Sequence, residues 1–262
     1  MSRHSDRSII VTGAAGAIGF ATCEILAREG ARLLMVDINA GRLAERSDAL
    51  RAKGARVEKF VADCGEESDV KRYAQAAVDA FGRIDGFFNN AGVEGKLAPT
   101  HEYDVAEFDR LTRVNMRGVF LGLRYVLPDM VRRGSGAVVN MASIGSERGL
   151  AGACAYNATK HAVVGLTRTA ASEVGQKGVR VNCIMPGVIE TPLLLDVIEQ
   201  LFPGNAEQGL TKIGQVATLN RCGKPEEVGN VVSFLLSEEA SYVNGAKWEI
   251  DGGALATIRN DI

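Results

Sequence analysis

The amino-acid sequence predicts an α/β fold, in which a doubly wound, seven-stranded parallel sheet carries helices on both faces. Short β-branched and apolar runs alternate with helical stretches along the chain, and this alternation is typical of parallel sheets. A glycine-rich loop joins the first apolar run to the first helical stretch. No linker rich in Pro, Gly or Ser and no repeat interrupts the 262 residues, so we expect one domain over residues 1–262.

The predicted strands read as apolar runs, as parallel strands buried on both faces should. They lie at 8–12, 32–36, 56–61, 84–88, 137–141, 179–184 and 246–250. The predicted helices cover 17–29, a stretch up to about Lys53, one that ends at Phe81, a long one from about 104 to 132 with Pro128 as a kink, and 155–174.

Residues 190–223 do not follow this alternation of strands and helices. They contain Pro192, Pro203, Gly204 and Gly209 and show no clear helical or strand periodicity of apolar residues. A long segment of this kind is often a mobile flap over a site. We expect these residues to cover the substrate, and an ordinary surface excursion is the alternative.

Composition excludes several classes of function. A net charge of −2 argues against nucleic acid as a partner. The apolar runs are short and broken by Gly or charge, so no membrane span is expected. The N-terminal residues are polar, and five scattered cysteines form no Cys-x-x-Cys. We therefore expect reduced thiols, a cytoplasmic location and no bound metal.

The glycine-rich loop from Thr12 to Gly19 follows the first strand and opens the first helix. Small residues let the backbone approach a diphosphate, and the helix N-terminus supplies unpaired N–H groups and a positive dipole end. The loop therefore predicts a dinucleotide site.

Asp37 closes the second strand, 24 residues after Gly13. A carboxylate there can accept hydrogen bonds from both ribose hydroxyls of an adenosine, and it would repel the extra phosphate of NADP. No Arg or Lys lies at 14–16, so NAD is the predicted cofactor. A role for Asp37 as the cap of the next helix is the alternative.

Two further groups follow strands at their carboxyl ends, where such sheets bind ligands. Asp63 follows the third strand and can meet the adenine edge, and residues 89–92, Asn-Asn-Ala-Gly, follow the fourth.

Tyr156 and Lys160 lie four residues apart in a helical run, on one helix face. A free phenol has a pKa of about 10. A nearby positive charge lowers that pKa, so the pair could exchange protons with a carbonyl or alcohol oxygen. A solvated surface pair is the alternative reading of this motif.

Taken together, these motifs resemble the classical short-chain dehydrogenase/reductase family over nearly the whole chain. The markers are the 12–19 loop, Asp63, 89–92, Asn115 in Asn-Met-Arg-Gly, Ser143, Tyr156 with Lys160, and Pro186-Gly187 with Thr191. One departure is Ala17, where the family usually has Gly. The resemblance implies a Rossmann-type domain and a homotetramer.

Carried over by residue, the resemblance implies that Tyr156 is the general acid/base and Lys160 its activator. Ser143 would hold the substrate oxygen, and Asn115 would bind Lys160 through a water. Structural alternatives are a turn capped by Ser143 and a helix broken by Asn115. The cofactor residues implied are Gly13, Ala15, Gly16, Ala17, Ile18, Gly19, Asp37, Ile38, Asp63, Cys64, Asn90, Ala91, Gly92, Tyr156, Lys160, Pro186, Gly187, Val188, Ile189 and Thr191.

The predicted reaction is hydride transfer between NAD and a secondary alcohol or its ketone. Gly145, Leu150 and Leu194 would line the substrate site with Ser143 and Tyr156, and apolar walls suggest a cyclic or aromatic-ring-bearing small molecule. Within the family, segments 81–96 and 117–123 resemble a reductase of a cyclic diketone, but these segments are mostly scaffold and cofactor loop. The expected substrate walls, 144–154 and 193–219, do not match closely enough to transfer a substrate, and dehydrogenases of cyclic diols and secondary alcohols are equally plausible. A 3-oxoacyl-carrier-protein reductase and a non-catalytic NAD-binding sensor are the alternatives.

Overall fold

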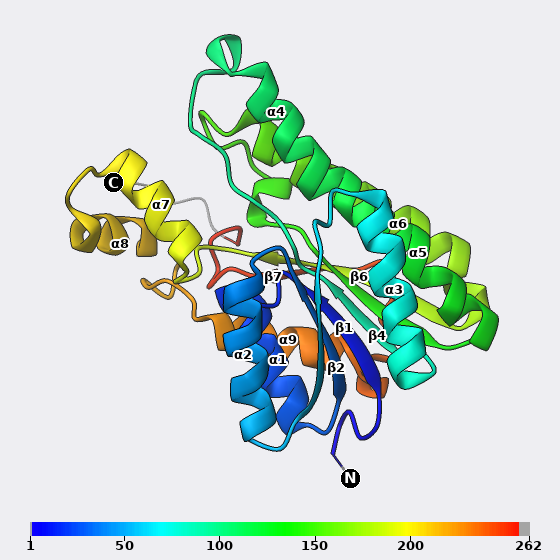
Figure 1. The fold of residues 1–262 in the computed structure, drawn as a ribbon. Coiled ribbons are helices and arrows are strands. Elements are labelled where there is room, and N and C mark those ends of the chain that lie inside the picture. Colours follow the sequence, from blue (N-terminus) through cyan, green and yellow to red (C-terminus); the bar gives the residue numbers. More distant parts are fainter. Residues whose placement is uncertain (1, 257–262) are drawn as a thin grey trace.

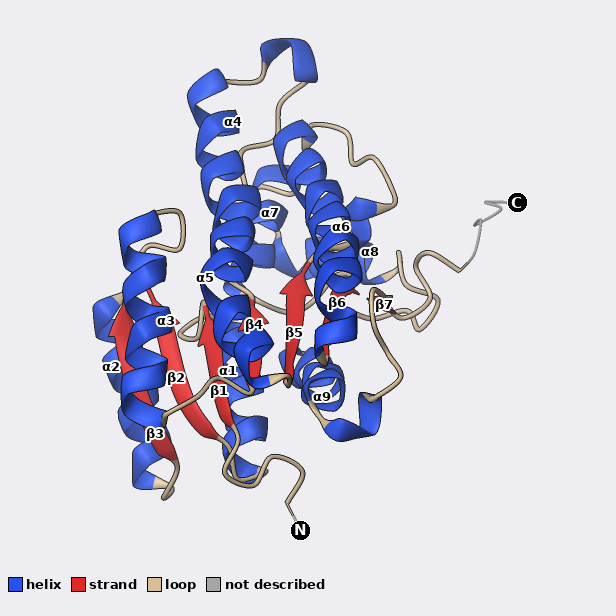
Figure 2. Cartoon of the chain, turned by 90° about the vertical axis from the view of Figure 1, so that its right-hand side faces the viewer, coloured by secondary structure: helices blue, strands red, loops and turns tan. Residues whose placement is uncertain are grey.

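A single seven-stranded parallel sheet forms the centre of the molecule (Figures 1 and 2). The structure is a computed structural model that describes residues 2–256, so residues 1 and 257–262 of the predicted domain lie outside it. The sheet order is β3-β2-β1-β4-β5-β6-β7. The strands are β1 Ser8–Thr12, β2 Arg32–Asp37, β3 Arg56–Val61, β4 Gly86–Asn89, β5 Gly136–Met141, β6 Val179–Pro186 and β7 Lys247–Ile250.

Helices pack on both faces of the sheet, which confirms the predicted doubly wound architecture (Figure 2). The main helices are α1 Ala17–Arg28, α2 Ala40–Ala52, α3 Glu67–Phe81, α4 Val105–Leu111, α5 Gly118–Arg133, α6 Cys154–Val174, α7 Pro192–Leu201, α8 Ala206–Gly214 and α9 Pro225–Leu236. One buried apolar cluster joins α1, α2 and α9 to the sheet, and a second joins α3, α5 and α6 to the opposite face. The predicted elements do not include α9, which has Pro225 in its first turn and a buried apolar face.

Strand register brings the carboxyl ends of the central strands to one edge. Thr12 pairs with Val36 across β1 and β2, and Asn89 pairs with Asn140 across β4 and β5. The Asn89 side chain donates to Asn140 Oδ1 at 3.2 Å, and both residues are buried. Because every strand runs the same way, the loops after β1, β2, β4, β5 and β6 meet at this edge.

The long helix expected over 104–132 is interrupted. It consists of α4, a π-helical turn over Thr112–Arg117, and α5. Pro128 lies inside α5, so the departure from α-helical geometry occurs at the π turn rather than at the proline. Single π turns often coincide with functional positions, and this one contains Asn115.

The segment 190–223 is more regular than the sequence indicates. It contains α7 and α8, which stand out from the sheet in Figure 1. Thr191 caps α7 by accepting from the backbone N–H of Leu194 at 3.2 Å, and Asn205 caps α8. The prolines that suggested irregular structure lie at the start of α7 and just after its end, where they are compatible with a helix.

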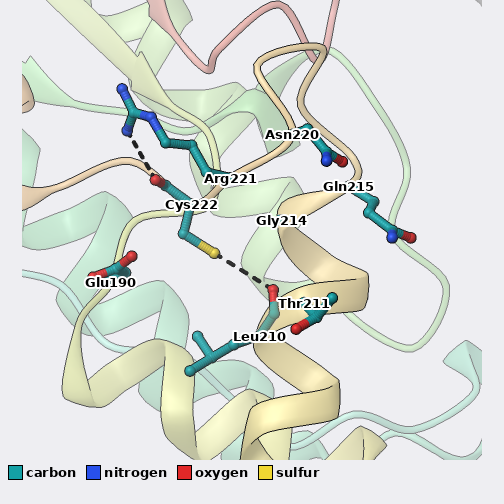
Figure 3. A pocket seen from close by; sticks show the side chains of 8 residues that line it. All are labelled: Glu190, Leu210, Thr211, Gly214, Gln215, Asn220, Arg221 and Cys222. Atoms are coloured by element: carbon teal, nitrogen blue, oxygen red, sulfur yellow. Dashed lines mark hydrogen bonds between the residues drawn. The ribbon is translucent and has the colours of Figure 1, made fainter.

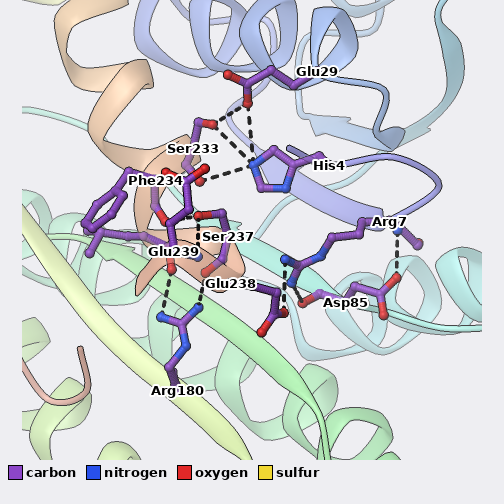
Figure 4. A network of polar contacts seen from close by, with 12 residues as sticks. His4, Arg7, Glu29, Asp85, Arg180, Ser233, Phe234, Ser237, Glu238 and Glu239 are labelled. Atoms are coloured by element: carbon purple, nitrogen blue, oxygen red, sulfur yellow. Dashed lines mark hydrogen bonds and ion pairs between the residues drawn. The ribbon is translucent and has the colours of Figure 1, made fainter. Parts of the chain in front are cut away.

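A polar network ties the N-terminal segment to α9 and β6 at the opposite edge of the sheet (Figure 4). His4 is fully buried, and its Nε2 lies 3.1 Å from Ser233 O and 3.6 Å from Glu29 Oε2. Burial lowers the pKa of His4 to about 4, and the charge of Arg7 adds to this shift. Arg180 donates to the carbonyl of Ser237 at 2.8 Å. The network therefore holds the fold together on the side away from the strand ends just described.

Among the helices that the structure describes, none is long and apolar enough to cross a membrane.

Candidate active site

The loop after β1 is packed so closely that only small residues fit. Gly13 has φ +62, and a Cβ added to it would lie 2.7 Å from Asn90 Nδ2. A Cβ on Gly19 would lie only 2.1 Å from the carbonyl oxygen of Gly13. No side chain within residues 2–256 caps the N-terminus of α1, which begins after Gly16. This end of α1 therefore presents free N–H groups and its positive dipole end to an anion.

The ends of β1 and β4 are joined by Thr12 and Asn90. Thr12 Oγ1 accepts from the backbone N–H groups of Asn90 at 3.0 Å and Ala91 at 3.1 Å. Asn90 Nδ2 donates to the carbonyl of Thr12 at 2.8 Å. Thr12 begins the predicted loop 12–19, but sequence reasoning gave its side chain no role of its own. Its position as the polar last residue of an apolar strand is the signal that could have found it.

Asp37 ends β2 beside the glycine-rich loop. Its Oδ2 accepts from the N–H of Ala15 and its Oδ1 from the N–H of Asn39, each at 2.9 Å. The cap of α2 is Asn39, which accepts from Arg42 N at 3.0 Å, so the alternative role of Asp37 as that cap is wrong. Ile38 is 66% exposed. This surface can receive a ribose on Asp37 and an adenine ring against Ile38.

Asp63 and Cys64 follow β3 at the same edge. Asp63 Oδ1 accepts from Gly65 N at 2.8 Å, and its Oδ2 accepts from Arg113 at 2.9 Å. The backbone N–H of Ala62 donates to Asp37 O at 3.1 Å, which places this segment beside Asp37.

The residues predicted to hold the nicotinamide end follow β6. Gly187 N donates to Ile250 O at 3.0 Å, and a Cβ on Gly187 would lie 2.8 Å from Asp251 Cα. Val188 O accepts from Gly223 N at 2.8 Å. Pro186 is the last residue of β6, Ile189 forms a parallel bridge with Gly223, and Thr191 caps α7. These contacts fix a short backbone segment between the sheet and the helices of segment 190–223.

Ser143, Tyr156 and Lys160 come together at the ends of β5 and α6. The Ser143 hydroxyl hydrogen-bonds the phenol of Tyr156, and Ser143 Oγ accepts from Gly145 N at 3.1 Å. Lys160 Nζ donates to Met141 O at 2.9 Å and lies 5.5 Å from the centroid of the Tyr156 ring. Lys160 is 4% exposed, so the solvated surface pair is wrong.

Burial controls the protonation of this group. It raises the pKa of the Tyr156 phenol well above its ordinary value, and the nearby charge of Glu94 adds to that rise, whereas the bond from Ser143 opposes it. Burial also lowers the pKa of Lys160 to about 8, which Glu94 partly offsets. The sequence predicts a lowered pKa for Tyr156. The structure gives the opposite direction, because desolvation of a phenolate costs more than the surrounding groups return.

Glu94 is a further titratable group of this site. Burial raises the pKa of its carboxyl to about 7, with the charge of Asp196 adding and that of Lys160 opposing. Its electrostatic effect on both Tyr156 and Lys160 is a feature of the tertiary structure.

Asn115 is fully buried and faces the loop after β4. Its Oδ1 accepts from Val93 N and its Nδ2 donates to Val93 O, both at 2.8 Å. A Cβ on Gly92 would lie 3.2 Å from Asn115 Oδ1 and 3.6 Å from Lys160 Nζ. Asn115 therefore lies near the ammonium and holds the backbone beside it.

The predicted substrate contacts are spread around this centre. Leu150 is 55% exposed, and Leu194 lies in the first turn of α7. Gln200 of α7 accepts from Leu97 N at 3.0 Å, so α7 touches the loop that follows Gly92. A Cβ on Gly145 would lie 3.5 Å from the Tyr156 ring.

A separate cavity of about 270 Å³ lies between α8 and the segment 220–222 (Figure 3). Its lining includes Glu190 and Arg221, and Cys222 Sγ lies 3.9 Å from Leu210 O. None of the four predicted catalytic residues lines it, so it is a feature of segment 190–223 rather than of the Tyr156 centre.

The chemistry of the donor set fits a dinucleotide. The helix N-terminus suits a diphosphate, Asp37 suits a ribose, and the glycines leave room for close approach of the backbone. Within residues 2–256, no group of three His, Cys, Asp or Glu side chains gathers where it could hold a metal ion.

The fold and this edge of the sheet define the class of protein, a Rossmann-type oxidoreductase with a Ser-Tyr-Lys centre. A family model described as enoyl-(acyl carrier protein) reductase matches residues 13–254. The chain is 46% identical over 257 residues to levodione reductase of Leifsonia aquatica, covering 97% of this chain and 96% of that protein. It is 35% identical over 251 residues to cyclohexanol dehydrogenase of Acinetobacter sp. (strain SE19), covering 96% of each.

Solved structures agree. The crystal structure of levodione reductase matches with a TM-score of 0.95 and 46% identity, covering 98% of this chain and 100% of that one. NAD+-bound xylitol dehydrogenase matches with a TM-score of 0.92 and 31% identity, covering 96% and 100%. The chain belongs to the short-chain dehydrogenase/reductase family of oxidoreductases, which confirms the resemblance drawn from its motifs.

Proposed function

We propose that this protein is an NAD-dependent dehydrogenase/ketoreductase that interconverts a secondary alcohol on a ring and its ketone. The proposal rests on the convergence of Ser143, Tyr156 and Lys160 at the carboxyl edge of the sheet, the same edge that carries the glycine-rich loop. Asp37 at the end of β2 supports NAD over NADP, because its carboxylate would repel a phosphate on the ribose.

The side chains divide the work of the reaction. A bound nicotinamide ring supplies the hydride acceptor or donor. Tyr156 takes the hydroxyl proton during oxidation and returns it during reduction. Ser143 Oγ accepts the N–H of Gly145, and its hydroxyl proton, which points to the Tyr156 phenol in this structure, would turn to the substrate oxygen and stabilise the negative charge that develops there. Lys160 is mostly protonated at neutral pH, since its pKa is about 8, and its charge favours the phenolate of Tyr156.

The other predicted residues hold the reactants in place. The loop 13–19 would receive the diphosphate, Asp37 and Asp63 the adenosine, and residues 186–191 the nicotinamide end. Asn115 would bind a water that reaches Lys160. We propose that segment 190–223 of a single domain closes over the substrate, since α7 already contacts Leu97 through Gln200.

A ring substrate is supported by two observations. Apolar side chains stand exposed on α7 and on the loop after Ser143, with Leu193 at 41% and Leu150 at 55%. A relative that covers 96% of this chain is named for cyclohexanol. A 3-oxoacyl-carrier-protein reductase is less compatible with Asp37, because that synthesis normally requires NADPH. A non-catalytic sensor is not favoured, since every member of the predicted catalytic set is present.

The test follows NADH formation with cyclohexanol, open-chain secondary alcohols and acyl thioesters, using NAD and NADP side by side. Tyr156→Phe should lower turnover roughly 10²–10⁴-fold, the usual worth of general acid/base catalysis. Tyr242→Phe is the matched control, because Tyr242 is fully exposed and should turn over normally. Near-normal turnover by folded Tyr156→Phe would falsify the mechanism, and preference for acyl thioesters would overturn the ring-alcohol assignment.

We also infer a homotetramer in the cytoplasm. Phe120 on α5 is 48% exposed, so an apolar side chain on this helix is available for self-association. All five cysteines are free thiols, which suits a reducing compartment. Light scattering of the purified protein tests the assembly, and a monomeric mass would rule the tetramer out.

A further inference from the structure

The segment 63–66, which follows β3, is held by side chains from two other helices. Arg113 Nη1 donates to Asp63 Oδ2 at 2.9 Å and to Glu66 Oε1 at 2.8 Å. Asp63 N donates to Asp69 Oδ2 of α3 at 2.9 Å. One guanidinium therefore bridges the first and last residues of the segment.

The Arg113 side chain also packs closely against the middle of the same segment. A Cβ added to Gly65 would lie 2.6 Å from Arg113 Nη1 and 3.0 Å from its Cζ, so glycine is needed for this packing. Arg117, one turn further along, donates to the carbonyl of Gly65. A planar guanidinium can bridge two carboxylates in this way, whereas a single ammonium cannot match the geometry.

Both arginines come from the π turn Thr112–Arg117 that contains Asn115. Asn115 pairs with the backbone of Val93 beside Lys160. The same turn thus supports the adenine-side segment with Arg113 and the catalytic side with Asn115.

The charge around segment 63–66 makes a cation necessary. Burial together with the nearby carboxylates of Asp63, Asp37 and Asp69 raises the pKa of the Cys64 thiol to about 12, against an opposing effect of Thr12. Asp63 and Glu66 would repel each other, and would repel an approaching diphosphate, if Arg113 did not stand between them.

We propose that Arg113 is a positioning residue for the adenosine half of the dinucleotide. Its two ion pairs hold Asp63 and the backbone of Cys64 in the conformation that receives the adenine edge. The inference rests on the proposed function, because it requires adenosine to bind at this segment.

The test measures dissociation constants of ADP-ribose, which lacks the nicotinamide, and of NADH. Arg113→Ala should weaken both by about tenfold, the scale expected when charge-assisted hydrogen bonds are lost. Turnover at saturating NAD should stay within about twofold of wild type, because positioning of the adenosine affects binding rather than the chemical step. Arg113→Lys should recover part of the affinity, since its ammonium can reach one carboxylate.

Two further variants keep the test decisive. Arg113→Gln retains the stem that packs on Gly65 and serves if Arg113→Ala does not fold. Arg72→Ala is the charge-matched control, because Arg72 pairs with Asp69 at 2.6 Å and, within residues 2–256, makes no hydrogen bond or ion pair to segment 63–66 itself. Its affinity for ADP-ribose should stay within about twofold of wild type, as expected for an exposed ion pair.

The outcomes separate the two claims. If wild type binds ADP-ribose and the Arg113 variants bind it equally well, the inference is overturned and the proposed function stands. Equal weakening by Arg72→Ala would show that charge alone matters, which also overturns the positioning role. If wild type binds neither ADP-ribose nor NADH, the proposed function fails, and the inference fails with it.

Discussion

Replacing Asp37 by Asn should erase much of the preference for NAD over NADP. The Asp37 carboxylate uses both oxygens, one for Ala15 N and one for Asn39 N, each at 2.9 Å. Asn keeps the shape and one carbonyl acceptor but removes the charge. The substitution therefore tests the electrostatic part of cofactor choice while changing the volume of the site very little.

The size of the effect follows from Coulomb's law. A ribose phosphate carries a charge of about −1.5 to −2 at neutral pH. At a separation of roughly 5 Å and a water-like permittivity, its repulsion by one carboxylate is about 1.5 kcal/mol, and a lower permittivity increases it. The ratio of NADPH to NADH affinity should therefore rise roughly 10- to 100-fold in Asp37→Asn. Affinity for NADH should fall, because its ribose loses a charged acceptor.

Binding of NADH and NADPH can be measured by nucleotide fluorescence, without knowledge of the substrate. Asp48→Asn is the control: it removes the same charge from α2, where the Asp48 side chain is 64% exposed and 3.3 Å from Arg51, and it should leave the ratio unchanged. Thermal unfolding of both variants checks the fold. An unchanged NADPH-to-NADH ratio in folded Asp37→Asn, or an equal shift in Asp48→Asn, would refute the reasoning.

Three other predictions concern the site and the fold. Lys160→Met should abolish most turnover yet raise the thermal unfolding midpoint at neutral pH. The reason is that an apolar side chain replaces a buried ammonium, whose pKa burial lowers to about 8. A lowered unfolding midpoint would contradict this prediction. The pKa of His4 is about 6.5 in the unfolded chain and about 4 in the folded protein. Between these pH values the unfolded chain binds a proton that the folded protein does not, so about 3 kcal/mol of the free energy of unfolding is lost as the pH falls from 6.5 to 4. In urea unfolding, His4→Gln should lose less stability over this pH range, and a pH profile identical to wild type counts against the assignment. Gly19→Ala should prevent NADH binding, because the added Cβ would lie 2.1 Å from Gly13 O. Gly165→Ala is the control and should bind NADH normally, because the space around Gly165 is open. Normal NADH binding by both variants would show that the glycine-rich loop is not the dinucleotide site.

Much of the fold could be predicted because its signals are local. The central strands are short apolar runs, whereas the edge strands β3 and β7 include charged residues. Strand-helix alternation leaves few topologies other than a doubly wound parallel sheet. The seven predicted strands are all present, with β4 beginning at Gly86 rather than Ile84. The helices of segment 190–223 were missed, since prolines at helix ends resemble the prolines of irregular segments until their positions are known.

The candidate site also has a part that the sequence predicts and a part that it does not. The sequence by itself determined which residues gather at the carboxyl edge, because each follows a strand and all strands run in one direction: the 13–19 loop, Asp37, Asn90, Ser143 and the residues after β6.

Only the tertiary structure decided how those residues are charged and supported. The raised pKa of Tyr156, the influence of Glu94 and the bridge from Arg113 to Asp63 depend on burial and on groups far apart in the chain. Desolvation and Coulomb interactions are set by distances in space, which sequence spacing does not contain.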